Sequence, residues 1–302
     1  LRPRIRQLVW PNWTAAMPDD LSVDNLIIRG SRKLAACKID NPRSEAGLLL
    51  RIAANLTREE VMVGGSRPVD HDLVQVFHSY ISRRVRGEPV SRINGRREFW
   101  SLEFEITPAT LDPRPDSEVL VASVLRLLAD RGMNSPSVLD LGTGSGCLLI
   151  ALLSELPEAT GVGADIDAGA ISIARRNAAT IGVDRRATFV VSNWGSAIAG
   201  QFDVVLANPP YIPTHVIPEL DSTVRWFDPV LALDGGKDGL FCYRAIAGAL
   251  PNLLAAGGLA AFEVGEGQSF GVMAILRSAG LQAIAQWPDL AGIQRCVTGT
   301  FQ

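Results

Sequence analysis

The second half of the chain alternates short apolar runs with amphipathic stretches. The apolar runs predict buried strands at residues 137–141, 160–165, 187–191, 202–207 and 258–264. Apolar residues at helical spacing predict helices at 119–129, 147–156, 168–181 and 269–280. Strands and helices that follow one another in this way are typical of a parallel α/β sheet. The closing segments 281–287 and 295–301 predict a terminal strand pair.

The first half of the chain has a helical pattern, from about Asp19 to Arg86. One helix is predicted at residues 43–56. A second is predicted by an apolar stripe formed by Leu73, Val76, Phe77, Tyr80 and Ile81. From Phe99 to Thr110 the period changes to alternation, which predicts a hairpin or an extended linker. We therefore expect a disordered extension at 1–20, a helical domain at 21–90, a hairpin linker at 91–112 and an α/β domain at 113–302.

Composition narrows the class of protein. The chain has 302 residues, 47% of them hydrophobic, which suffices for a substantial core in one large domain or two. Its net charge of −3 argues against a generally basic, nucleic-acid-coating surface. The cysteines form no CxxC pair, so neither zinc nor a disulfide framework is indicated. No apolar run is long enough to span a bilayer. We therefore expect a reducing compartment.

A glycine-rich turn, Gly142 to Gly146, links the strand predicted at 137–141 to a helix. The turn also contains Thr143, Gly144 and Ser145. Its glycines let the backbone turn sharply and approach a ligand at the positive end of that helix. Such turns are common, so alone the signal is weak. An ordinary structural turn is the alternative.

The next predicted strand ends in Asp165, about twenty residues beyond the glycines. A carboxylate there can accept hydrogen bonds from both hydroxyls of a ribose. The turn lacks the GxGxxG spacing and the lysine of a phosphate-binding loop, which disfavours a dinucleotide or ATP. An adenosine without phosphates fits better, and S-adenosylmethionine is such a ligand. A solvated Asp165 is the alternative.

The strand predicted at 202–207 ends in Asn208, Pro209, Pro210 and Tyr211. Each proline removes a backbone donor and fixes φ, so the pair ends the strand and forces the preceding carbonyls outward. Asn208 and Tyr211 add an amide and a flat aromatic face on either side. The carboxyl ends of parallel strands share one edge of the sheet, so this turn should face the same crevice as the glycines. The alternative is an ordinary proline turn.

An ordered set of motifs at 86–100, 113–118, 140–146, 208–212, 233–240 and 265–268 resembles the release-factor glutamine-N5 methyltransferases, the HemK/PrmC family. The resemblance covers about Ser22 to Thr300. It implies a class I (Rossmann-like) seven-stranded methyltransferase domain, preceded by a small helical bundle and a β-hairpin. It also implies methyl transfer from S-adenosylmethionine to the side-chain amide nitrogen (N5) of the glutamine in the Gly-Gly-Gln motif of peptide-chain release factors.

The same resemblance implies roles for individual residues. Gly142 to Gly146, Asp165, Trp194 and Asn208 would contact S-adenosylmethionine. Asn208 to Tyr211 would hold the substrate glutamine. The chain departs from the usual family pattern by Ser117 for threonine, Asn193 for an acid, Ile293 for arginine and Asp112 for an aliphatic residue.

Two rival functions remain open on sequence grounds. One is a methyltransferase of adenine in nucleic acid, because such enzymes share the Asn-Pro-Pro-Tyr motif. The other is a cofactor-binding interaction module that keeps the fold without the activity. We expect a monomer that binds neither membranes nor nucleic acid stably, and no metal. The bacterial cytoplasm is the first expectation for its compartment, and a mitochondrial matrix is the second.

Some charged residues have two possible interpretations. The concentration of arginines from Arg83 to Arg97 fits a solvated face about as well as a docking surface for a protein or RNA partner. Glu263 and Glu266 could be catalytic, but exposed loop carboxylates are the expectation for both.

Overall fold

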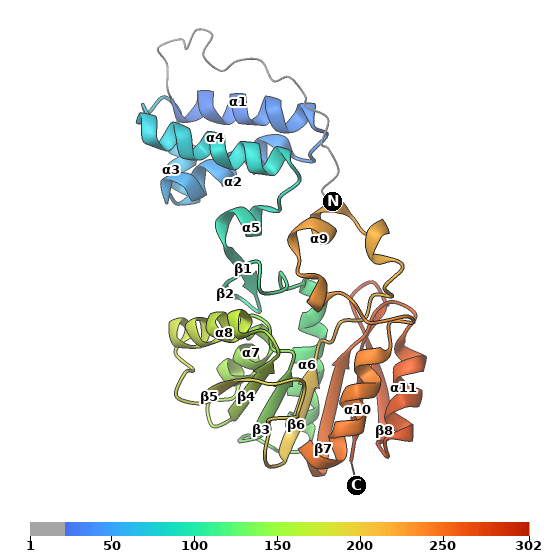
Figure 1. Cartoon of the computed structure of the whole chain (residues 1–302). Coiled ribbons are helices and arrows are strands. Elements are labelled where there is room, and N and C mark those ends of the chain that lie inside the picture. The colour runs from blue at the N-terminus through green and yellow to red at the C-terminus, as the bar shows by residue number, and fades with distance from the viewer. Residues whose placement is uncertain (1–21, 302) are drawn as a thin grey trace. The chain divides into compact units, whose positions relative to one another are not determined.

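The computed structural model describes residues 22–301. The chain divides into two compact units, and the boundary along the sequence lies between Ile93 and Asn94 (Figure 1). The extension expected at residues 1–20 lies outside the described residues. Among those described, no helix is both long and apolar enough to cross a bilayer.

The first unit is helical, as its sequence pattern predicts. Its helices are α1 (Val23–Ala36), α2 (Pro42–Ala54), α3 (Arg58–Val63), α4 (His71–Val85) and α5 (Val90–Asn94), the last of which runs into the second unit. Apolar side chains of α1, α2 and α4 form a separate core. The first turn of α4 begins at a cap, because Asp70 Oδ1 accepts the Leu73 N–H at 2.7 Å.

The apolar stripe predicted for α4 is wrong at one residue, Val76. Val76 is 40% exposed, whereas Val74, Phe77 and Ile81 are buried. Two residues along a helix rotate the side chain by about 200°, so Val74 and Val76 cannot both face the core. The buried stripe therefore begins at Val74.

The second unit opens with a two-stranded hairpin, β1 (Arg96–Phe99) and β2 (Leu102–Glu105). Its turn residues Trp100 and Ser101 have φ of 54° and 57°, the left-handed pair that matches the twist of a two-residue hairpin loop. The hairpin begins before the alternation predicted from Phe99, and no strand covers residues 106–110.

Four arginines of the suspected basic surface are paired with carboxylates. The pairs are Arg83–Glu88, Arg84–Glu45, Arg96–Glu103 and Arg97–Asp112. These four guanidinium groups are therefore partly neutralised by neighbouring carboxylates, two in each unit.

Seven strands of the second unit form one mixed sheet in the order β5-β4-β3-β6-β7-β9-β8, within the described residues. They are β3 (Ser137–Leu141), β4 (Thr160–Asp165), β5 (Ala187–Val191), β6 (Phe202–Ala207), β7 (Leu254–Glu263), β8 (Gln282–Pro288) and β9 (Gln294–Thr300). Neighbours among β3 to β7 pair in parallel, and β9 is antiparallel to both of its neighbours. The predicted seven-stranded α/β fold is confirmed.

Helices cover both faces of this sheet (Figure 1). The helices α6 (Glu118–Asp130), α7 (Cys147–Glu155) and α8 (Ala168–Ile181) pack on one face. The helices α10 (Phe241–Leu253) and α11 (Ser269–Ser278) pack on the other. The short elements η1 (Pro115–Ser117), η2 (Ile217–Glu219), α9 (Ser222–Phe227) and η3 (Val230–Ala232) lie in the connections. The chain changes direction at β3, between β4 and β6, which is where open α/β sheets bind ligands.

Candidate active site at the carboxyl ends of the strands

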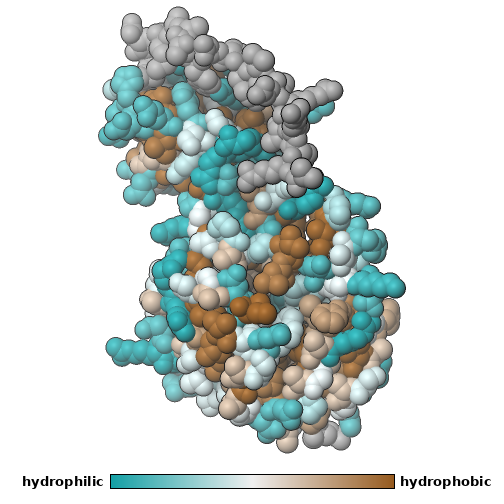
Figure 2. Space-filling model, viewed as in Figure 1, coloured by the Kyte–Doolittle hydropathy of each residue, from teal (hydrophilic) through white to brown (hydrophobic). Residues whose placement is uncertain are grey.

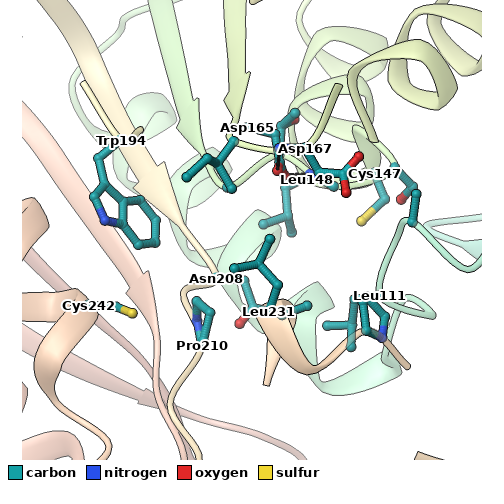
Figure 3. A pocket seen from close by; sticks show the side chains of 18 of the residues that line it. Leu111, Cys147, Leu148, Asp165, Asp167, Trp194, Asn208, Pro210, Leu231 and Cys242 are labelled. Carbon is teal, nitrogen blue, oxygen red and sulfur yellow. Dashed lines mark hydrogen bonds between the residues drawn. The ribbon is translucent and has the colours of Figure 1, made fainter. Parts of the chain in front are cut away.

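A cavity of about 310 Å³ opens where β3, β4, β5 and β6 end (Figure 3). Predicted site residues that line it are Gly142, Thr143, Gly144, Ser145, Asp165, Trp194, Asn208 and Pro210. Predicted site residues outside its lining are Gly146, Pro209 and Tyr211. The structure therefore brings the glycine turn, the carboxylate and the Asn-Pro-Pro-Tyr turn to one place.

The glycine turn is tied to the neighbouring strand. The N–H groups of Gly142 and Thr143 donate to the Ala164 carbonyl at 2.8 and 2.9 Å. At Gly144, φ is 55°, and an added Cβ would meet no atom within 4 Å. The backbone there is bare toward the cavity, so a ligand can approach it closely. At Gly146 an added Cβ would lie 2.9 Å from Ile150, which gives this glycine a packing role at the start of α7.

The carboxyl groups of Asp140 and Asp165 hold this turn by hydrogen bonds. Asp140 is fully buried and accepts the Thr143 hydroxyl at 2.6 Å, and burial raises its pKa to about 7. Asp165 accepts the N–H groups of Gly144 at 2.9 Å and of Asp167 at 3.0 Å. Burial raises the pKa of Asp165 despite these hydrogen bonds. Asp165 lines the cavity, so its remaining lone pairs can accept from a ligand.

Trp194 forms an aromatic wall of the cavity (Figure 3). Its φ is 50°, a costly conformation for a bulky residue. The Ser192 hydroxyl helps to hold it by donating to the Trp194 carbonyl at 2.7 Å. Strain of this kind gathers at functional sites, and a flat ring beside a bare backbone and a carboxylate suits a nucleoside.

The Asn208 side chain is anchored at the end of β6. Its Nδ2 donates to the Ser117 hydroxyl oxygen at 3.3 Å. Ser117 is 3% exposed and belongs to the 113–118 motif. With Nδ2 engaged, Oδ1 is the polar atom that Asn208 can offer to a ligand in the cavity.

Tyr211 does not line the cavity, but its hydrogen bonds hold this turn. Its carbonyl accepts from Gln268 Nε2 at 2.8 Å, and its hydroxyl donates to Glu263 Oε1 at 3.4 Å. The next residue is fixed as well, since Ile212 exchanges backbone hydrogen bonds with Leu233 and Gly235. The motifs at 233–240 and 265–268 thus hold the Asn-Pro-Pro-Tyr turn in place.

Gly235 lies directly against the turn, and its replacement is our first prediction. A Cβ at this position would come within 2.7 Å of Tyr211 Cα and 2.8 Å of the Pro210 carbonyl oxygen. Backbone atoms cannot move aside cheaply, so Gly235→Ala should destabilise the fold by about 1 to 3 kcal/mol and displace the turn. We expect a lower melting temperature and about a 10-fold loss of any activity that depends on the position of this turn.

The matched control is Gly248→Ala on the exposed side of α10, where an added Cβ meets no atom within 4 Å. A helical glycine exchanged for alanine without a clash should stabilise slightly. Thermal unfolding and single-turnover rates of both variants check this, and equal behaviour would contradict the role given to Gly235.

Glu263 corrects a prediction from the sequence. It is 2% exposed, at the end of β7 inside the sheet, and burial raises its pKa to about 7. Only Glu266 is the exposed loop carboxylate that was expected. An acid that directly follows an apolar strand is the signal that could have singled out Glu263.

Sequence reasoning also missed an ion pair at the cavity wall. Arg114 lines the cavity and pairs with Asp228 at 2.5 Å, whose side chain is 2% exposed. Arg114 is in the 113–118 motif, but its partner lies in an irregular loop. Within residues 22–301, no group of three or more His, Cys, Asp or Glu side chains is placed to hold a metal ion.

The strand order, with an antiparallel strand inserted next to the edge, and the cavity at the switch point define the class I methyltransferase fold. The hMettl16 catalytic domain in complex with a hairpin of the MAT2A 3′UTR shares this fold, with a TM-score of 0.55 and 14% identity over 74% of this chain and 82% of that one. The 16S rRNA methyltransferase RsmC of T. thermophilus has a TM-score of 0.50 and 16% identity over 68% of this chain and 50% of that one.

Sequence relatives identify the family. A release factor glutamine methyltransferase of Rhodospirillum rubrum is 43% identical over 277 residues, 92% of this chain and 84% of that protein. One of Caulobacter vibrioides is 40% identical over 88% of this chain and 92% of that protein. The family profiles "PrmC N-terminal domain" and "Methyltransferase small domain" match residues 25–95 and 116–220. The chain belongs to the release factor glutamine methyltransferase family.

Proposed function

We propose that the protein transfers the methyl group of S-adenosylmethionine to the side-chain amide nitrogen of the glutamine in the Gly-Gly-Gln motif of peptide-chain release factors. The observation that carries this proposal is Asn208, whose amide is anchored by Ser117 and lines the same cavity as the glycine turn and Asp165. Bacterial relatives of that name support the same substrate.

The residues around the cavity fit S-adenosylmethionine, which would supply an electrophilic methyl group. Asp165 would accept hydrogen bonds from the ribose hydroxyls, and the bare backbone at Gly144 would admit the amino-acid part. Trp194 would give the adenine an aromatic wall. Of the predicted contacts, Gly146 acts through packing at the start of α7.

An amide nitrogen is a poor nucleophile because its lone pair is delocalised into the carbonyl. Asn208 Oδ1 and the Pro209 carbonyl would accept the two N–H bonds of the target amide and direct the lone pair at the methyl group. Fixing two reactants in this way can supply about 7 to 11 kcal/mol of the barrier, so no strong general base is required. The new N–C bond would form as the sulfur–methyl bond breaks, S-adenosylhomocysteine would leave, and the amide nitrogen would lose one proton during or after transfer. The Tyr211 carbonyl accepts from Gln268 and its hydroxyl donates to Glu263, so we assign Tyr211 to holding the turn rather than to stacking on the amide.

The cavity rim favours a protein substrate over a nucleic acid. Leu231 and Phe241 line it and are 59% and 63% exposed. Exposed hydrophobic side chains are also visible elsewhere on the viewed surface of the second unit (Figure 2). Phosphate backbones are held by free cations, and Arg114 at this rim is already paired with Asp228. An apolar rim suits a glycine-rich peptide loop better. We further propose that the protein is a monomer and works in the bacterial cytoplasm.

The test is to incubate the protein with methyl-labelled S-adenosylmethionine and either a release factor, the same factor with its Gly-Gly-Gln glutamine replaced by alanine, or adenine-containing DNA and RNA. Label should enter only the unmodified release factor, at one glutamine. Label in nucleic acid would support the adenine methyltransferase instead, and no label in any substrate would support the non-enzymatic module.

The helical first unit is expected to recognise the protein substrate. It has its own core, and no residue before Ala109 lines the cavity. A chain that starts at Asn94 should therefore bind cofactor with unchanged affinity in calorimetry. Its kcat/KM for intact release factor should fall about 10-fold or more, because losing even ~1.4 kcal/mol of binding energy has that effect. Full kcat/KM in the shortened chain would contradict this role.

A further inference from the structure

A buried carboxylate lies beside the reacting turn without touching the cavity. Glu263 ends β7, which pairs in parallel with β6 up to Ala207 and Phe262, so Glu263 and Asn208 follow at neighbouring positions. Glu263 is 2% exposed, and its Oε2 accepts no hydrogen bond from the described residues. Burying a carboxyl group is costly, and its location beside the turn calls for a role.

Ser117 connects this carboxyl group to Asn208. The Ser117 hydroxyl interacts with the Glu263 carboxyl group closely enough to lower its pKa, and the Ser117 oxygen receives the Asn208 Nδ2 donor at 3.3 Å. A serine hydroxyl has one proton and two lone pairs. When Glu263 is a carboxylate it can only accept, so the serine proton goes to Glu263 and the serine oxygen accepts from Asn208.

The direction of these bonds decides which end of the Asn208 amide remains for the substrate. With Nδ2 turned to Ser117, Oδ1 is left as the acceptor that the proposed reaction requires. With a protonated Glu263 that donates to Ser117, the serine proton would instead be free to donate to Asn208 Oδ1. The amide would then rotate by half a turn and offer Nδ2, a donor, to the N–H bonds of the target amide.

We propose that Glu263 and Ser117 are positioning residues that fix the polarity of the Asn208 amide. The inference rests on the proposed function, because it concerns how Asn208 orients the target nitrogen. Glu263 acts through Ser117 and touches neither substrate nor cofactor.

This arrangement predicts a pH dependence. Charged and titratable groups near Glu263 are Asp116, Tyr211, Arg295, Tyr243, Cys147 and Cys296. Burial, with a smaller contribution from Asp116, raises the pKa of Glu263 to about 7, while Ser117, Tyr211 and Arg295 act in the opposite direction. The carboxylate is the competent form, so the transfer rate should rise with pH through about 7 and fall below it.

The first readout is single-turnover transfer to release factor from pH 5.5 to 8.5. In Glu263→Gln the acid limb should disappear. Ser117→Ala should lower kcat about 10-fold, the effect of one hydrogen bond, with little change in KM. Ser117→Thr keeps the hydroxyl and should restore most of that loss together with the acid limb. Glu158→Gln and Ser278→Ala, both exposed and outside the cavity lining, are the matched controls and should keep the profile of the unsubstituted protein.

The second readout needs neither cofactor nor substrate. The side-chain NH₂ signal of Asn208 in ¹⁵N-asparagine-labelled protein, assigned by its loss in Asn208→Ala, should shift with pH with a midpoint near 7. The shift should vanish in Glu263→Gln and in Ser117→Ala. Thermal unfolding establishes that each variant is folded.

The outcomes separate the two proposals. If the unsubstituted protein does not methylate release factor, the proposed function fails, while the NMR titration still tests the positioning pair. If the acid limb and the Asn208 titration both persist in Glu263→Gln, they belong to another group such as Asp140, and the positioning role is overturned.

Discussion

Replacing Asn208 with alanine should lower the single-turnover rate of methyl transfer by about 100- to 1000-fold, the effect of removing one preorganised polar contact from a reacting centre. The loss should fall on the rate rather than on release-factor affinity, because the interaction aims the lone pair in the transition state. Folding should survive, since Pro209 and Pro210 still shape the turn and Tyr211 is still held by Gln268.

The matched control for this change is Asn134→Ala, an exposed asparagine in the turn before β3. It should leave both the rate and cofactor binding unchanged. Asn208→Asp is a subtler variant, which keeps an acceptor but adds charge, so cofactor should bind while the amide is aimed badly. A normal single-turnover rate in Asn208→Ala would disprove the mechanism.

Replacing Asp165 with alanine should weaken S-adenosylmethionine binding about 100-fold or more, because two hydrogen bonds to a charged group are lost, each worth about 1.5 to 3 kcal/mol. The change also releases the Gly144 and Asp167 N–H groups that Asp165 accepts, which loosens the glycine turn itself. Titration calorimetry measures the affinity directly.

Asp184→Ala offers the comparison, since this aspartate is exposed and lies outside the cavity lining. Its affinity should match that of the unsubstituted protein. If Asp165→Ala binds equally well, Asp165 is not part of the cofactor site.

The sequence predicted those parts of the site that depend on local patterns. The glycine turn, Asp165 and Asn208 each directly follow an apolar strand, and parallel strands bring their carboxyl ends together whatever the side chains between them. The core strands were also predicted well, because a strand that is buried on both faces has a continuous run of apolar residues.

The supporting contacts could not be predicted because they depend on tertiary structure. Ser117 and Glu263 are far apart along the chain, and no local pattern shows that they meet beside Asn208. Helix α10 was missed because Gly248 and Pro251 interrupt its helical signal. Val76 was wrongly placed in the core because Val74, two residues earlier in α4, is the one of the two valines that is buried.

The anchoring of the Asn-Pro-Pro-Tyr turn by distant segments has a consequence for how the enzyme becomes active. The cofactor side of the cavity is built from β3, α7 and β4, which are consecutive and close their contacts over short loops. The turn at Asn208 is complete only when Ser117, Gly235 and Gln268, from both sides of it in the chain, have reached it. Closing such long loops is entropically costly and slow. We therefore expect the glycine-turn half of the cavity to form before the Asn-Pro-Pro-Tyr half, so that activity would be the last property regained on refolding.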